Sequence, residues 1–507
     1  MILKRDLQGS PKTQQSAWPR SRAALFLFAY LIIVTAILYT LFIHWAYDDP
    51  YITYRYAQNL DRGLGFVYNP GERVLSTTTP LFAILLAFIG KVWPDLPKAA
   101  NLIGATSLAA GGVLLWDLAR SWRKPIAGWI CLALYPTFPL LLNTMGSETP
   151  MYLAFCIGAY SFYARRKYPL AALFSAFAVL ARPDGTIVPA LLSLDYIIRL
   201  RHLIPWKAIG IFVAITFSWY SFAWVYFGSP IPATLGAKQH QGAMAISQRF
   251  AGGFVQILGW YSSWPYILEA ILAIAGFLMI LRNARRWLLF FAWPILYFAG
   301  YSILGVSRYF WYYAPLVPGF MAAVGLGFEG IESALSSVLE SAQGSVLRRM
   351  SVKKASLRAG LALLLLLLFV PLMFGQGRSL WRLREQSDRR YQVYRAIGDW
   401  LRENTARDAQ VGALEVGIIG YYAGRPMVDF AGLIQPLVAQ QLSAGTNYED
   451  AALWAIAHYH PDYLVLQQDA FPQVEQAYVG NSCVLAKRFP GDRYNFSSDI
   501  GVYACGK

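Results

Sequence analysis

Two adjacent carboxylates, Asp48 and Asp49, follow directly after a long apolar run of this chain. The run, residues 23–43, is long enough to cross a bilayer as a helix, which leaves both carboxylates where the membrane meets water. Ionisable groups at this depth are costly to keep and indicate a functional site. A carboxylate there can act as a general base, both can hold a divalent cation, or the pair can simply cap a juxtamembrane helix.

Asp49 is the predicted base of the two. Neighbouring residues of a helix point about 100° apart, so only one carboxylate is expected to face a substrate. Repulsion between the adjacent carboxylates would raise the pKa of one of them toward a value useful for proton transfer. We therefore expect Asp49 to take the proton and Asp48 to orient it, to bind hydroxyls or to share in holding a metal.

Two cations at the ends of later apolar runs, Lys238 and Arg308, are candidates for binding a phosphate. An arginine can hold phosphate through two parallel hydrogen bonds, and a lysine supplies a compact positive charge. Both side chains could instead anchor helix ends among lipid headgroups.

Further polar and aromatic residues lie at the ends of apolar runs and are candidates for contacting an acceptor or a sugar: Glu148, Tyr51, Tyr54, Arg55, Arg182 and Asp184. Each also has a structural interpretation. Glu148 can belong to a helix-capping motif, and Arg182 can pair with Asp184 around a helix break. Tyrosines near a membrane boundary commonly form an interfacial belt.

The composition indicates a membrane protein. Of 507 residues, 56% are hydrophobic and only 14% are charged, against about 25% charged in soluble domains. The net charge of +16 comes largely from short basic clusters between apolar runs, as in the cytoplasmic loops of membrane proteins. We therefore expect membrane lipids as partners and no nucleic acid.

The predicted organisation is a cytoplasmic tail (1–22), a transmembrane region (23–377) with a first outer loop at 44–79, and an outer α/β domain (378–507). About eleven or twelve spans are expected in a multi-pass inner-membrane protein. After 23–43 the candidate spans are 80–93, 99–119, 126–143, 149–164, 169–181, 186–198, 206–227, 264–281, 287–304, 309–328 and 359–376. An outward Asp48/Asp49 pair requires one early segment not to cross, and the short 80–93 run or the proline-broken 126–143 run is expected to be that segment.

The outer domain contains Cys483 and Cys505, which could form a disulfide, whereas Cys131 and Cys156 lie in apolar runs and are expected to pack there. It also contributes Glu415 and Asp429 to the acidic residues of the outer side. The five histidines include no H-x-x-x-H pair, which argues against a zinc site but leaves a divalent cation at the aspartate pair open.

Four motifs together resemble the GT-C superfamily of membrane glycosyltransferases. They are DDPYITYRYAQNL at 48–60, NPGERV at 69–74 followed by TTPLF at 78–82, ARPDG at 181–185, and GIIGYYAGRPMVDFAGL at 417–433. Within the superfamily the chain is most similar to the bacterial branch that includes the terminal arabinofuranosyltransferases of actinobacterial cell walls.

The resemblance implies transfer of a sugar from a polyprenyl-phosphate donor to a glycan or lipid acceptor on the outer face of the membrane. It also implies that an acidic residue of the first outer loop is the base. The residues leave two other classes open. One is a transporter or flippase of lipid-linked sugars, in which the acidic pair would be a proton or cation site. The other is a carbohydrate-binding or assembly protein that acts through its outer domain.

Overall fold

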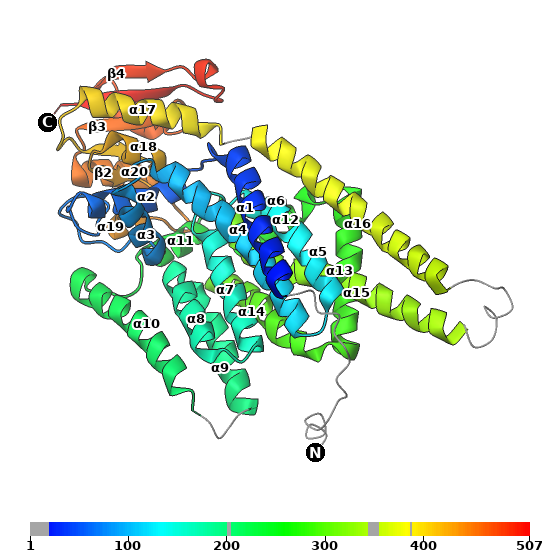
Figure 1. The fold of residues 1–507 in the computed structure, drawn as a ribbon. Helices are drawn as coiled ribbons and strands as arrows, with labels where there is room; N and C mark the ends of the chain where they lie inside the picture. The colour runs from blue at the N-terminus through cyan, green and yellow to red at the C-terminus, as the bar shows by residue number, and fades with distance from the viewer. Residues whose placement is uncertain (1–19, 200–203, 343–353, 386–387, 507) are drawn as a thin grey trace.

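The computed structural model describes residues 20–199, 204–342, 354–385 and 388–506. It has a large helical part and a smaller α/β domain, formed by the C-terminal residues, at one end of the helices (Figure 1). The predicted polytopic helical membrane protein with a C-terminal α/β domain is therefore confirmed. Most of the predicted N-terminal tail (1–22) lies outside the described residues.

Seven helices of the described chain are long and apolar enough to cross a membrane, judged by length and composition. Their main segments are α1 (Arg20–Phe42), α4 (Leu96–Ser121), α10 (Trp206–Phe227), α13 (Trp264–Asn283), α14 (Leu288–Leu304), α15 (Val317–Ala342) and α16 (Lys354–Glu385). Two short 3-10 helices, η4 (Arg285–Trp287) and η5 (Phe310–Leu316), lead into α14 and α15.

The remaining predicted spans form helices of fewer than 18 residues; 80–93 is shorter than predicted and 126–143 is broken, whereas 149–164, 169–181 and 186–198 appear at nearly their predicted bounds. They form α3 (Pro80–Gly90), α5 (Pro125–Leu134), η2 (Tyr135–Thr137), α6 (Pro139–Leu142), α7 (Thr149–Ala164), α8 (Tyr168–Ala181), η3 (Pro183–Thr186) and α9 (Ile187–Arg199), and an unpredicted apolar helix α12 (Phe250–Trp260) follows α10. At about 1.5 Å per residue, α3 reaches about 17 Å, roughly half of a hydrocarbon core. The 126–143 run is broken at its prolines, so both segments suspected of incomplete crossing are short. Beside the seven long helices, the described residues contain four shorter apolar helices of 10–17 residues, and the expected count of eleven or twelve spans stays a prediction.

Glycines bring the central helices close together. A Cβ at Gly276 of α13 would overlap the carbonyl oxygen of Ala323 in α15, and a Cβ at Gly327 of α15 would overlap that of Leu272 in α13. Small residues at such contacts let helix backbones approach in a membrane, where van der Waals packing drives association. The backbones of α13 and α15 therefore pack closely against each other.

Two helices lie at the end of the bundle that faces the α/β domain, α2 (Asp49–Asp61) and α11 (Thr234–Ala243). Pro50 occupies the first turn of α2, where its fixed φ favours helix initiation and places Asp49 at the helix start. The loop after α2 holds α11 in place, because the N–H of Ala233 donates to the carbonyl of Leu75 at 2.8 Å. Of these two helices, α2 lies within the predicted first outer loop at 44–79.

The C-terminal domain contains α17 (Arg390–Asn404), β1 (Val411–Ala413), α18 (Gly417–Ala423), β2 (Met427–Asp429), α19 (Pro436–Ala439), α20 (Tyr448–Tyr459), β3 (Tyr463–Gln467), α21 (Pro472–Tyr478), β4 (Cys483–Phe489), η6 (Asp492–Tyr494) and β5 (Ile500–Cys505). The strands form one sheet in the order β2-β1-β3-β5-β4. β2, β1 and β3 are parallel, and β5 pairs antiparallel with both β3 and β4.

Two sequence expectations for this domain can be compared with the structure. The boundary placed after residue 377 falls inside α16, which continues as a helix to Glu385. Cys483 and Cys505 form a disulfide between β4 and β5, while Cys131 and Cys156 are buried free thiols. The disulfide that the sequence left open is therefore present.

Candidate active site

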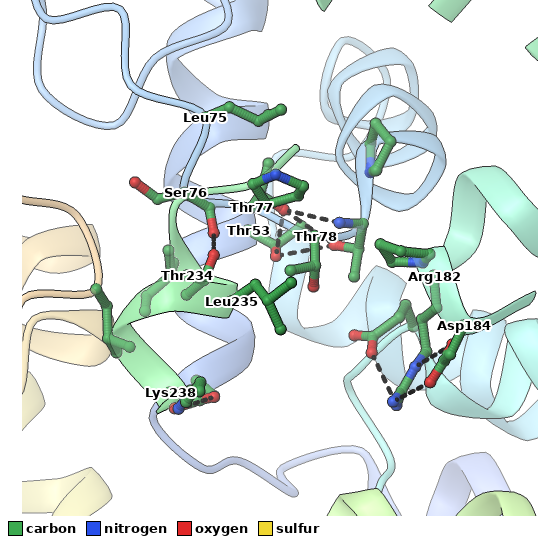
Figure 2. Close-up of a pocket in the computed structure, with 18 of the residues that line it drawn as sticks. Thr53, Leu75, Ser76, Thr77, Thr78, Arg182, Asp184, Thr234, Leu235 and Lys238 are labelled. Carbon is green, nitrogen blue, oxygen red and sulfur yellow. Dashed lines mark hydrogen bonds and ion pairs between the residues drawn. The ribbon is translucent and has the colours of Figure 1, made fainter. Parts of the chain in front are cut away.

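A pocket with a volume of about 410 Å³, here called the first pocket, lies beside Asp49. The start of α2, the loop before α3, the ends of α7 and α8, and α11 surround it. In Figure 2, Lys238 lies on one side of this pocket and the Arg182–Asp184 pair on the other, with Leu235 between them. The cavity is therefore apolar over much of its wall, with charged groups at its edges.

A second pocket of about 320 Å³ lies between the helical part and the C-terminal domain. Tyr47, Asp49, Trp311 and Leu433 line both pockets. Among the residues that line the two pockets, Asp49 is thus the one carboxylate common to both. Its side chain is 34% exposed. A group in this position can contact two different substrates at once.

Lys238 is the cation nearest to Asp49. Its Nζ lies 3.6 Å from the carboxylate of Asp49 and 3.7 Å from the centre of the Tyr309 ring, and the residue is only 5% exposed. Burial lowers the pKa of this ammonium and Asp49 raises it, with a net rise, so Lys238 is charged at neutral pH. Within the described residues its Nζ has no hydrogen-bond partner, which leaves three donors for a ligand.

Asp48 has a different environment from its neighbour. Its carboxylate accepts the N–H groups of Gly417 at 2.9 Å and Ile418 at 2.8 Å, which caps the N-terminus of α18 in the C-terminal domain. It makes no capping bond to its own helix α2. The expectation that Asp48 assists at a substrate is replaced by a structural role, because both of its oxygens are used by backbone donors.

The Asp48 contact belongs to a larger junction between the first outer loop and the C-terminal domain. The Asn69 side chain exchanges two hydrogen bonds of 2.9 Å with the backbone of Met427, and the Tyr68 hydroxyl donates to the carbonyl of Val416 at 2.6 Å. Gly417 is required at this junction, because a Cβ there would overlap the backbone of Asp48. The C-terminal domain is therefore fixed against the residue next to Asp49.

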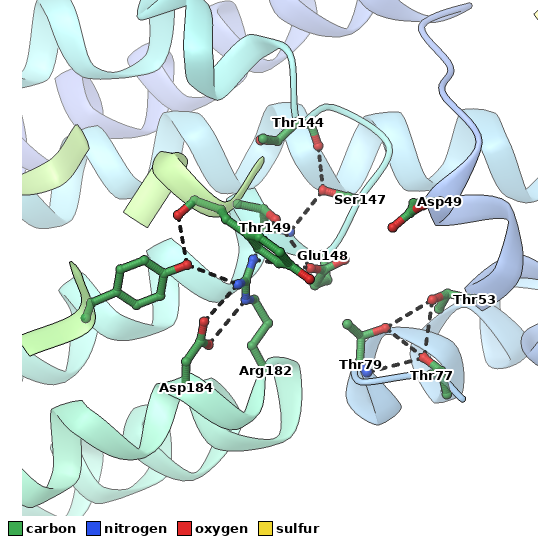
Figure 3. Close-up of polar contacts among 12 residues, drawn as sticks. Asp49, Thr53, Thr77, Thr79, Thr144, Ser147, Glu148, Thr149, Arg182 and Asp184 are labelled. Atoms are coloured by element: carbon green, nitrogen blue, oxygen red, sulfur yellow. Dashed lines mark hydrogen bonds and ion pairs between the residues drawn. The ribbon is translucent and has the colours of Figure 1, made fainter. Parts of the chain in front are cut away.

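Arg182, Asp184 and Glu148 form a buried charged cluster in the wall of the first pocket (Figure 3). The Arg182 guanidinium donates twice to Asp184, at 3.2 and 2.8 Å, and lies 3.7 Å from Glu148. Tyr301 donates to Asp184 at 2.8 Å. The expected pairing of Arg182 with Asp184 around the helix break is present, and the cluster also borders the cavity.

The sequence analysis missed a cluster of hydroxyls beside this site. Thr53, Thr77 and Thr79 approach one another at 3.1 to 3.3 Å and face the first pocket (Figure 3). The TTTP segment gave the only sequence signal for them, since Thr53 lies on α2 and meets the others only in the fold. Such hydroxyls can both donate to and accept from sugar oxygens.

Three predicted sugar-binding residues do not line either pocket. Tyr51, Tyr54 and Arg55 are each at most 2% exposed and face the C-terminal domain or the core. Tyr54 donates to the carbonyl of Gly146, and Tyr51 packs against the ring of Tyr421. Their position on the buried face of α2 indicates packing in place of the expected contact with a sugar.

Arg308 lines the second pocket, whereas Lys238 lines the first. The two cations that the sequence grouped together nevertheless lie on contacting segments, because the N–H of Ser307 donates to the carbonyl of Lys238 at 3.2 Å. The Arg308 guanidinium donates to the side chain of Gln256. The two predicted phosphate ligands thus line different pockets, and Asp49 lines both of these pockets.

The C-terminal domain brings its own charges to the second pocket. Arg390 bonds to Glu415 at 2.6 Å and to Asp388 at 2.7 Å. Burial, followed by the Glu415 carboxylate, raises the pKa of Asp48, and burial raises that of Glu415 although Arg390 opposes the rise. Arg390, near the start of the domain, is therefore engaged in ion pairs.

The residues present do not fit a divalent-cation site. Among the described residues, no group of three or more histidine, cysteine, aspartate or glutamate side chains is placed to hold a metal ion. Asp48 directs its oxygens to backbone N–H groups and Asp49 faces an ammonium, so the pair does not converge on a cation. A metal-binding role for the aspartate pair has no support in this arrangement.

Comparisons with known proteins give a fold. Residues 381–503 match a family described as a domain of unknown function, DUF8728. No curated protein matches the sequence. ArnT from Cupriavidus metallidurans bound to undecaprenyl phosphate is similar in structure, with 13% identity, a TM-score of 0.61 and coverage of 96% of this chain and 98% of that one.

A second similar structure is the archaeal oligosaccharyltransferase AglB from Archaeoglobus fulgidus, in complex with an inhibitory peptide and a dolichol-phosphate. It is 12% identical, with a TM-score of 0.57, and the match covers 96% of this chain and 75% of that one. Both are GT-C glycosyltransferases, so this chain has the GT-C fold that its sequence motifs predicted.

Proposed function

We propose that this protein is a membrane glycosyltransferase that moves a sugar from a polyprenyl-phosphate donor to a hydroxyl group of a glycan or lipid acceptor. The observation that carries the proposal is the position of Asp49, which lines both pockets and is partly exposed to each. A transfer between two substrates needs a base that can reach the acceptor while the donor is bound, and Asp49 meets this requirement. Lipid phosphates bound to ArnT and AglB support the choice of donor.

Asp49 acts as the general base in this proposal. Its carboxylate accepts the proton of the acceptor hydroxyl while the acceptor oxygen forms a bond to the anomeric carbon of the donor sugar. The bond between that carbon and the phosphate oxygen breaks, and the lipid phosphate leaves with the electron pair. A single displacement of this kind inverts the anomeric carbon. General-base assistance typically contributes about 10²- to 10⁴-fold to the rate.

Lys238 neutralises the leaving phosphate in this proposal. A charged, buried ammonium whose hydrogen-bond donors are unused has already lost its water, so its attraction to a phosphate is stronger than at a surface. Its ion pair with Asp49 holds the two groups together before the substrates bind. Arg308 can add charge from the side of the second pocket.

The lipid part of the donor fits the first pocket. Trp219 and Tyr220 of α10 and Leu304 of α14 contribute to its wall, and α10 exposes apolar side chains such as Phe217 and Trp224. A prenyl chain can therefore pass from the bilayer along α10 while its phosphate reaches Lys238. We place the site and the C-terminal domain on the outer face of the inner membrane, because basic clusters lie in the loops predicted to be cytoplasmic.

The test is sugar transfer by the full-length protein in vesicles supplied with labelled polyprenyl-phosphate sugars, including arabinofuranose and mannose donors, and a panel of glycan and lipid acceptors. Asp49→Asn should lower transfer by about 10²-fold or more, because an amide cannot accept the proton. Asp61→Asn is the matched control, since Asp61 is an exposed residue at the other end of α2 and lines neither pocket.

Transfer by wild type and Asp61→Asn, with loss in a folded Asp49→Asn, supports the proposal. Equal transfer by all three proteins contradicts the assignment of the base. Movement of labelled lipid across the bilayer without any product contradicts the transferase and supports a flippase.

A further inference from the structure

We propose that the second pocket binds the acceptor, that the acceptor portion bound there is an uncharged, hydroxyl-rich glycan, and that the C-terminal domain forms one wall of its site. This inference rests on the proposed function, because only a transferase has an acceptor substrate. The pocket, its charges and its aromatic surface can be tested without any transfer reaction.

The C-terminal domain contributes a substantial part of the second pocket. Four separate segments of the domain line it, through Arg390 of α17, Glu415 after β1, Leu433 after β2 and Tyr448 of α20. The junction at Asp48 fixes this wall at the start of α2. The segment that matches DUF8728, residues 381–503, therefore borders the second pocket.

Carboxylates outnumber cations in this pocket. Asp48, Asp49, Asp388 and Glu415 line it together with two arginines. The guanidinium of Arg390 is already held by two of these carboxylates.

Arg308 is therefore the one arginine of this lining that is not paired with a carboxylate in the described structure, and it donates to Gln256. A phosphate or carboxylate group entering here would lie beside the carboxylates of Asp49 and Asp388, with Arg308 as the one arginine of the described lining that is not already paired with a carboxylate. A hydroxyl group would instead donate a hydrogen bond to a carboxylate oxygen, which is a strong, charge-assisted interaction.

Aromatic faces line the same pocket. Tyr309 and Trp311 stack at 4.6 Å between ring centres, and Tyr448 lies at the wall formed by the C-terminal domain. Trp260, at the end of α12, also lines the pocket although 54% of its surface is exposed. Flat apolar rings among hydroxyl-binding carboxylates suit the two surfaces of a sugar, whose ring carbons are apolar and whose rim is polar.

The two pockets have different surroundings, as a lipid-linked donor and a water-soluble acceptor would require. The first is bordered by α10 and α14, which expose apolar side chains, and suits a lipid-linked donor. The second is bordered by the C-terminal domain and suits a substrate that arrives from water. Asp49 lies at both, so an acceptor hydroxyl in the second pocket can face a donor sugar in the first.

The experiment measures binding of neutral oligosaccharides, and of the same oligosaccharides carrying a phosphate, to the full-length protein in nanodiscs without donor. Arabinan and mannan fragments are the neutral probes, and saturation-transfer NMR reports which sugars bind. Trp260→Ala should weaken neutral binding about tenfold, a loss of about 1.4 kcal/mol. Its exposure means that the protein should remain folded. Trp264→Ala is the matched control, because Trp264 is 61% exposed, lies four residues later and lines neither pocket.

A second variant tests the charge argument. Glu415→Gln removes one carboxylate of the pocket and should weaken the neutral glycans while strengthening the phosphorylated ones. Tighter binding of phosphorylated than of neutral probes to the wild type would overturn the proposed acceptor chemistry. Unchanged binding in Trp260→Ala would overturn the pocket.

This design can refute the proposed transferase and the proposed glycan site independently of each other. If neutral glycans bind and Trp260→Ala weakens them, but no donor is ever consumed, the glycan site stands and the proposed transferase fails. If transfer is observed and Trp260→Ala raises the KM for the lipid donor alone, the transferase stands and the assignment of the second pocket fails.

Discussion

The contact between Asp48 and α18 gives the sharpest test of how this site is held together. In Asp48→Asn one side-chain oxygen can still accept the N–H of Ile418, but the new amide nitrogen is a second donor facing the N–H of Gly417. Hydrogen bonds to a charged group contribute about 1.5–3 kcal/mol each, and a buried N–H left without an acceptor costs about 1–3 kcal/mol. We therefore expect the variant to lose about 2–3 kcal/mol of folding free energy.

Gly417→Ala disturbs the same contact from the other side. The new methyl group would overlap the backbone oxygen of Asp48, so the loop and α18 must separate. Because both substitutions remove one contact, the double variant should lose less stability than the sum of the two single losses. Thermal unfolding of the full-length protein in nanodiscs, followed by tryptophan fluorescence, measures all three.

Transfer activity separates this structural role from a chemical one. At a temperature where both variants are folded, Asp48→Asn should keep measurable transfer, whereas Asp49→Asn should lose it. An Asp48→Asn protein with unchanged stability and no activity would refute the reasoning, because it would place the chemistry on Asp48. Additive losses in the double variant would refute the assigned contact.

Three further predictions concern stability. Arg182→Gln leaves Asp184 buried without its cation and should destabilise the protein by about 3–5 kcal/mol, measured as loss of folded protein on heating; an unchanged unfolding temperature would contradict the buried ion pair. Burial raises the pKa of Asp429 to about 7, so its folded state binds a proton more tightly than the unfolded state. The free energy of unfolding should therefore fall by about 1 kcal/mol as pH rises from about 6 to about 8, and Asp429→Asn should remove this slope in pH-dependent melting. Reduction of the Cys483–Cys505 disulfide, which closes a loop of 22 residues, should cost about 3 kcal/mol, and unfolding with and without reductant measures it.

The sequence predicted the class of fold because hydrophobic run length and charge distribution are local properties. Long apolar runs such as those of α1 and α10 appear as helices at the expected places. Run length alone does not show where a proline ends a helix, so the 80–93 helix ends earlier than its apolar run and the 126–143 run is broken into shorter helices. The apolar helix α12 was missed because its 11 residues are too short to stand out as a span.

The sequence also brought most of the chemistry into view but not its arrangement. It singled out Asp49, Lys238 and Arg308, which the fold brings to one region although they are as much as 259 residues apart in numbering. It could not separate Asp48 from Asp49, because adjacent carboxylates are alike until the backbone donors of Gly417 and Ile418 approach one of them.

By itself, therefore, the amino-acid sequence determined a helical membrane protein with a C-terminal α/β domain, and it predicted that a carboxylate at the membrane boundary is the general base. Only the tertiary structure decided which carboxylate is held by backbone N–H groups, that Tyr51 and Tyr54 pack in the interior, and that Thr53 joins Thr77 and Thr79. The physical reason is that helix formation and membrane insertion depend on neighbouring residues along the chain. Hydrogen bonds to a buried carboxylate and the shape of two adjoining pockets depend on segments that meet only when the chain has folded.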